Sequence, residues 1–272
     1  MKIAIRHRLN LAIGPGAPRA VQHILLTPTA GPTQSILEWA VEVPGDEHAT
    51  RFTDGFGNQA MLVTQTRPEA EIVISVTGLV TTIDRNGVIG RPAGEPPPAL
   101  FRRPTAATKP IGAITSKLRS TPRGGPDRIP LLHALMARVG EVLDETGQSQ
   151  SQQQDGQSQS QSQGQPQETA RLDATAYAHA FIGAARALDI PARFVTGYLH
   201  GADTPEAAFH AWAEAWDDGL GWIGFDAMLQ ICPTDAHVRV AVGLDASSTV
   251  PVRSVPVVGT PSVLDVKVET AQ

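Results

Sequence analysis

Apolar and polar residues alternate through the first third of the chain, which is the period-two pattern of half-buried β-strands. Five short segments carry this pattern and are bounded by Gly, Pro, Asp or Asn: Lys2–Arg8, Val21–Pro28, Ser35–Val43, Gln59–Thr66 and Glu71–Val80. Regular short strands without helical periodicity favour a small β-sandwich, which we expect over residues 1–88.

The pattern changes after residue 88. Residues 89–127 are rich in Pro and Gly and include Pro96-Pro97-Pro98, which indicates a linker lying across the surface between two domains. Apolar residues then recur at helical spacing over Leu131–Leu143. Residues 148–167 are almost entirely Gln, Ser and Gly. Such a segment cannot bury enough apolar surface to offset its ordering entropy, so we expect a disordered insert, tolerated as a loop rather than used as an interaction tract.

A second domain is expected over residues 128–272. Asp173–Asp189 has the apolar stripe of a core helix, with Asp173 or Thr175 as its cap. Three alternating segments follow, and a Gly-rich turn joins the last two into a hairpin: Arg193–His200, His210–Trp216 and Trp222–Asp226. A helix followed by an antiparallel sheet is an α+β layer arrangement.

Composition and charge narrow the classes of protein that this chain can be. It has 272 residues, of which 41% are hydrophobic and 18% charged, and its net charge of −5 argues against nucleic-acid binding. Apolar stretches fall well short of the roughly 20 residues that span a bilayer. Charges within the first residues argue against a signal peptide, so the expected location is cytoplasmic. The single cysteine, Cys232, excludes an internal disulfide and the usual multi-cysteine zinc site. We therefore expect no cofactor and no metal.

The order of helix, strand-borne His and strand-borne Asp is that of a papain-like catalytic site. A thiol at a helix N-terminus has its pKa lowered by the helix dipole and the free N–H groups. A His on a facing strand can take its proton, and an Asp one strand away can orient the imidazole. His210 and Asp226 lie on the two strands of the predicted hairpin and are the candidates for these roles.

Several separated motifs resemble the transglutaminase-like superfamily. In the second domain these are Ala178-His179, Leu188-Asp189-Ile190-Pro191-Ala192-Arg193, His210-Ala211-Trp212-Ala213-Glu214 and Gly221-Trp222-Ile223-Gly224-Phe225-Asp226. The first domain, with His7, Leu25-Leu26-Thr27-Pro28 and Phe56-Gly57-Asn58, is similar to the β-rich domain that precedes this core in bacterial members. The resemblance implies an N-terminal β-sandwich followed by a papain-like transglutaminase core.

The helix-start motif of that family departs in this chain. The family has Gly, any residue, Cys, any residue, Asp, an aromatic residue, Ala and His, which places Ala174 at the position of the nucleophilic cysteine. A methyl group cannot be a nucleophile, and the neighbouring Asp173 would oppose an oxyanion at the helix start. The resemblance therefore implies a site with a retained His210 and Asp226 and a lost nucleophile. We expect a pseudoenzyme that binds a peptide or protein partner.

Two alternatives remain open at this point. The chain could be an active cysteine-dependent peptidase, amidase or acyl-transferase that uses Cys232, or a structural protein that acts through its β-domain or its Gln/Ser tract. Cys232 follows the Asp-bearing strand and precedes Pro233, so it cannot occupy the helix start. His179 is interpreted as a structural hydrogen-bonding residue, and the tryptophans Trp212, Trp216 and Trp222 as packing residues, although Trp222 could also line a cleft.

Overall fold

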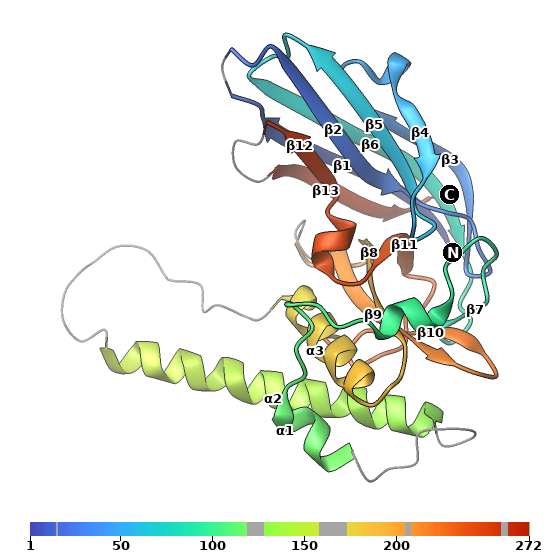
Figure 1. Ribbon diagram of the computed structural model, residues 1–272, viewed down its shortest axis with the longest axis vertical. Coiled ribbons are helices and arrows are strands. Elements are labelled where there is room, and N and C mark those ends of the chain that lie inside the picture. The colour runs from blue at the N-terminus through green and yellow to red at the C-terminus, as the bar shows by residue number, and fades with distance from the viewer. Residues whose placement is uncertain (15, 119–127, 158–172, 205–207, 257–260, 272) are drawn as a thin grey trace.

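The computed structural model describes residues 1–14, 16–118, 128–157, 173–204, 208–256 and 261–271. Within these residues, two four-stranded sheets form a sandwich, and a five-stranded sheet lies next to it with helices packed on one face (Figure 1). All strand pairs are antiparallel. The predicted α+β class is confirmed.

Each predicted strand of the first domain is present close to its expected bounds. One sheet has the order β13 (Ser262–Thr270), β1 (Lys2–Ala12), β6 (Glu71–Thr82), β3 (Gln34–Glu42). The other has the order β12 (Val252–Val255), β2 (Arg19–Thr27), β5 (Gln59–Thr66), β4 (Thr50–Thr53). Apolar side chains that face inward from both sheets, including Leu9, Ile24, Val63 and Ile74, form one buried cluster between them. This is the packing expected of a sandwich.

The sandwich is completed by two strands from the far end of the chain, which corrects the expectation that the second domain extends to residue 272. β12 pairs with β2, and β13 pairs with β1. Val252 and Val266 are buried in this arrangement, and the backbone N–H of Ala271 donates to the carbonyl oxygen of Lys2 at 2.9 Å. Both strands cover sheet edges that would otherwise present unpaired N–H and C=O groups. β12 and β13 therefore belong to the first domain.

The segment predicted as a surface linker also packs into the core. Its first residues form β7 (Val88–Gly90), which pairs with a strand of the five-stranded sheet. A 3-10 turn at Pro98–Arg102 buries Phe101 completely, with its ring 5.2 Å from that of Trp222. α1 (Gly112–Thr115) and another 3-10 turn (Ser116–Leu118) follow, and residues 119–127 lie outside the described residues. Burial of Phe101 makes this segment part of the second domain rather than a linker alone.

The five-stranded sheet carries the predicted hairpin at its centre. Its order is β11 (His237–Gly243), β8 (Ala192–Leu199), β9 (Phe209–Asp217), β10 (Gly221–Phe225), β7. α3 (Ala174–Ala187) and α2 (Arg128–Gln157) pack on one face of it, where Phe181 of α3 stacks on Phe225 with ring centres 5.1 Å apart. Ala211, Ala213 and Ala215 face these helices. By alternation, His210, Trp212 and Glu214 point to the opposite face.

α2 differs from its prediction in length. The expected helix at Leu131–Leu143 lies inside it, but α2 continues to Gln157, so residues 148–157 of the predicted disordered insert are helical. Gln has a favourable helix propensity, so these residues can continue the helix that begins in the well-packed part of α2. The rest of the insert, residues 158–167, lies outside the described residues. None of the described helices is long and apolar enough to cross a membrane.

Candidate functional site

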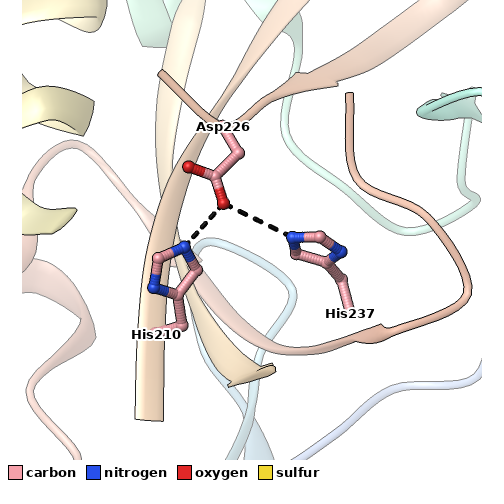
Figure 2. Close-up of side chains that lie close together, drawn as sticks. All are labelled: His210, Asp226 and His237. Atoms are coloured by element: carbon pink, nitrogen blue, oxygen red, sulfur yellow. Dashed lines mark hydrogen bonds and ion pairs between the residues drawn. The ribbon is translucent and has the colours of Figure 1, made fainter. Parts of the chain in front are cut away.

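His210 and Asp226 are brought together by the β9–β10 hairpin. His210 is the second residue of β9, and Asp226 directly follows β10, whose last residue pairs with Ala213. The side chains meet with 2.6 Å between Nε2 of His210 and Oδ2 of Asp226 (Figure 2). Both are buried, at 4% and 0% exposure. The distance is that of a strong, charge-assisted hydrogen bond.

Asp226 is surrounded by hydrogen-bond donors. Its Oδ1 accepts from the backbone N–H groups of Met228 at 3.2 Å and Leu229 at 3.0 Å. Its Oδ2 also lies 3.4 Å from Nε2 of His237. Burial by itself would raise the pKa of Asp226, but the hydrogen bonds from His210, His237 and the backbone outweigh it and lower the pKa to about 2. The carboxylate is therefore ionised at neutral pH and can orient an imidazole ring.

His237 is a member of this cluster that the sequence did not single out. It is the first residue of β11, is 6% exposed, and packs edge-on against Trp212 with ring centres 5.4 Å apart. Its Nδ1 accepts a hydrogen bond from the backbone N–H of Thr234 at 3.1 Å. The signal in the sequence was only a His that opens an alternating strand after the Asp, which is too common a pattern to indicate a site.

Two histidines and one carboxylate are a donor set that zinc or non-haem iron can use. The side-chain ligand atoms of His210, Asp226 and His237 all lie within 4.8 Å of one another. A metal ion bound to His237 would need a lone pair on Nε2, and the proton of the ring would then have to lie on Nδ1. The backbone N–H of Thr234 donates to Nδ1, so the proton of the neutral ring lies on Nε2. The cluster as arranged does not fit a metal ion.

The start of α3 holds the other predicted residue, Ala174. It is the first residue of the helix, half-buried, and packs against the apolar cluster beneath the helices. Asp173 caps the helix, and its Oδ1 accepts from the backbone N–H of Ala176 at 2.9 Å. The capping carboxylate uses one of the free N–H groups at this helix start and adds negative charge there. The catalytic assignments of Ala174, His210 and Asp226 stay predictions.

His179 and Cys232, the two other residues considered for catalysis, lie in environments that suit a structural role. Nε2 of His179 accepts from the backbone N–H of Ala246 at 3.0 Å, which confirms the prediction of a structural hydrogen bond. Cys232 is half-buried against the helix cluster, where burial and then the negative charge of Asp84 raise the pKa of its thiol. Neither residue has the environment of an activated catalytic group.

Four charged side chains, of which Arg193 and Glu214 are fully buried, form a ring on the same face of the sheet as His210. Arg193 donates from Nε to Glu214 and from Nη1 to Glu95, each at 2.6 Å. Arg239 donates to Glu214 at 2.9 Å and to Glu95 at 3.0 Å. The guanidinium of Arg193 also lies 3.9 Å from the ring centre of Trp222, which is 1% exposed. Trp222 is thus a packing residue, as predicted, and does not line a cleft.

Comparison with known proteins agrees with this fold. The family model of the transglutaminase-like superfamily matches residues 136–227, and that of the bacterial transglutaminase-like N-terminal region matches residues 3–81. A candidate cysteine protease from Cytophaga hutchinsonii shares the fold, with a TM-score of 0.65 and 20% identity over 99% of this chain and 89% of that one.

A curated relative matches over a shorter stretch. An uncharacterized protein of Mycobacterium leprae is 32% identical over 85 residues, which are 29% of this chain and 30% of that protein. The chain thus matches less than a third of the length of that relative. The two family models together cover more than half of the chain. Through these two regions, the chain is a transglutaminase-like family protein.

Proposed function

We propose that this protein is a catalytically inactive member of the transglutaminase-like family that binds a peptide or a protein partner. The observation that supports this most directly is the start of α3. By the resemblance to the family motif, the methyl group of Ala174 takes the position of the nucleophile, and the carboxylate of Asp173 caps the helix beside it. Acyl transfer needs both a nucleophile and a place for a developing negative charge; this helix start has no thiol, and a carboxylate already stands beside its N–H groups.

Cys232 does not replace the missing thiol in this proposal. Covalent catalysis uses the thiolate, and the pKa of Cys232 is raised by burial and by Asp84 rather than lowered. Its side chain lies close to Gly87, on the turn that precedes β7, and not at a helix N-terminus. The alternative of a working cysteine peptidase, amidase or acyl-transferase therefore has no activated thiol to support it among the described residues.

The retained pair of His210 and Asp226 supports a binding role. Nε2 of His210 donates to Asp226, and its Nδ1 has no hydrogen-bond partner among the described residues; in the neutral ring that nitrogen carries a lone pair. A backbone N–H of an extended peptide is a suitable donor for that nitrogen. An acceptor without a partner in the protein, which a ligand can satisfy, favours binding over a purely structural use.

The first experiment tests for turnover. We expect the purified protein to show no amine incorporation, peptidase or amidase activity above buffer. Clear turnover that disappears in His210→Ala would refute the proposal. Turnover that disappears in Cys232→Ser would instead establish the alternative enzyme.

The second experiment rebuilds the missing group and measures how much of the machinery is left. Ala174→Cys is compared with the double variant Ala174→Cys, Asp173→Asn, because Asn also caps helices but carries no charge. We expect the thiol at position 174 to react with iodoacetamide about tenfold faster in the double variant, since removing the adjacent charge lowers its pKa. Cys232→Ser is included in both to give a single thiol. Equal rates would show that Asp173 does not oppose a negative charge at this position.

The third experiment tests binding itself. A library of unstructured decapeptides is passed over immobilised protein and over His210→Leu, which removes the acceptor but keeps an apolar side chain of similar size. We expect a subset of peptides to be retained by the wild type and not by the variant. Equal retention by both, or retention by neither, would contradict a binding role for this site.

A further inference from the structure

His237 contacts the same carboxylate oxygen of Asp226 as His210 does, from a different strand. Figure 2 shows the two imidazole rings pointing at the same carboxylate oxygen, from β9 and β11. The Nε2–Oδ2 distances are 2.6 Å for His210 and 3.4 Å for His237. Two nitrogen atoms that approach one carboxylate oxygen must both carry protons, because the ionised carboxylate only accepts hydrogen bonds.

The tautomer of His237 is fixed independently of Asp226. The backbone N–H of Thr234 donates to its Nδ1 at 3.1 Å, so Nδ1 holds a lone pair and the proton of the neutral ring lies on Nε2. The turn that supplies this N–H is itself closed by a bond from the N–H of His237 to the carbonyl oxygen of Thr234 at 3.2 Å. Trp212 packs edge-on against the ring, with an interplanar angle of 81°. Backbone and packing thus aim Nε2–H at Asp226.

We propose that His237 is a positioning residue, a second N–H donor that holds the carboxylate of Asp226 in the orientation in which it receives the Nε2–H of His210. The carboxylate then has four donors, two backbone N–H groups on Oδ1 and two imidazoles on Oδ2. Four donors leave it little freedom to rotate. The Nε2–H of His210 is thereby held on Asp226, and its Nδ1 takes no part in that contact.

This inference deepens the proposed function and rests on it only for the use of Nδ1 by a ligand. The arrangement of protons is a property of the free protein and is measured without any peptide. Failure of peptide binding would therefore leave the role of His237 intact, and failure of the role of His237 would leave peptide binding to be judged separately.

The test is nitrogen and proton NMR of the histidine rings at neutral pH. In the wild type we expect His237 and His210 both as the Nε2–H tautomer, with slowly exchanging ring protons. Equimolar Zn²⁺ should leave both rings unchanged. A proton on Nδ1 of His237, protons on both of its nitrogens, or a zinc-dependent shift of both rings would overturn the proposal, the last in favour of a metal site.

Two variants separate the donor from the packing role. His237→Gln retains an N–H donor, and His237→Leu removes the donor while keeping an apolar side chain. We expect the ring proton of His210 to exchange with water about tenfold faster in His237→Leu than in the wild type, because one hydrogen bond to a charged group is worth at least that factor. In His237→Gln we expect exchange close to that of the wild type.

Unchanged exchange in His237→Leu would overturn the positioning role. Equal acceleration in both variants would overturn it as well, because it would show that only the shape of the ring matters. If His237→Leu does not fold, the wild-type tautomers and His237→Gln still decide the question.

Discussion

The ring of charges on Arg193, Glu95, Arg239 and Glu214 gives the sharpest prediction about stability. Glu214 is fully buried and accepts from both guanidinium groups, at 2.6 Å and 2.9 Å. Glu214→Gln keeps the shape of the side chain but removes its charge, and it turns one acceptor into an N–H group that faces a guanidinium. The variant is left with two cations, of which Arg193 is fully buried, and one carboxylate.

The expected magnitude follows from the burial of these groups. Removing one partner of a buried ion pair costs about 3–5 kcal/mol, because the remaining charge stays desolvated. Arg193 cannot turn to water, since it is 0% exposed and lies on the face of Trp222. Burial alone would raise the pKa of Glu214, but Arg193 and Arg239 lower it. Glu214 is therefore ionised at neutral pH, and the substitution by Gln removes a full negative charge. We expect a loss of about 4 kcal/mol, a large part of a typical stability of about 5–15 kcal/mol.

Urea unfolding followed by tryptophan fluorescence measures this loss. The matched control is Glu141→Gln, because Glu141 forms a 2.6 Å pair with Arg138 but is 59% exposed. An exposed pair is worth about 0.2–1 kcal/mol at most. The reasoning would be refuted if Glu214→Gln lost no more stability than Glu141→Gln.

Three further results are expected. In Gly197→Ala the new Cβ would lie 2.1 Å from the carbonyl oxygen of Val238, so we expect thermal unfolding to show a loss of stability of about 2–3 kcal/mol. Gly112→Ala, whose new Cβ would enter open space, should show no such loss. The pKa of Asp226, lowered from 3.8 to about 2, contributes about 2.5 kcal/mol of stability that is lost as pH falls from about 4 to about 2. Cys232, whose pKa is raised, should react with a thiol reagent at least about tenfold more slowly in the native than in the urea-unfolded protein.

Each of these results has a clear contrary outcome. Equal melting temperatures for the two glycine variants would show that β8 and β11 separate easily at Gly197. An acid unfolding curve of Asp226→Asn that falls as steeply as that of the wild type would remove the linkage argument. Native-state labelling of Cys232 at the unfolded rate would show that its thiol is accessible and ionised.

Local patterns in the sequence were sufficient to predict five strands of the sandwich, β1, β2, β3, β5 and β6. Alternation in Glu71–Val80, for example, depends only on which face each side chain takes, and β6 follows it closely. A partial alternation is present in Ser262–Thr270, but it does not say which sheet edge a strand will join. That choice depends on pairing across nearly the whole length of the chain, so the domain boundary was misplaced.

The candidate site was predictable to the same degree. His210 and Asp226 stand on the two strands of one hairpin, so a short stretch of sequence fixes their approach. His237 reaches Asp226 only because β11 lies beside β8, and Glu95 reaches Arg193 only because a Pro-rich segment folds into the core. Neither contact can be predicted from a local pattern in the sequence.

The return of β12 and β13 to the sandwich also sets the order in which this protein can fold. β1 and β2 are made first during synthesis, yet each pairs on one side with a strand that is made last. The first domain therefore cannot complete either of its sheets until the second domain has been synthesised. Pairings of such long sequence separation are slow to form and leave sheet edges open in the meantime. We expect the nascent first domain to depend on protection of those edges until the last strands arrive.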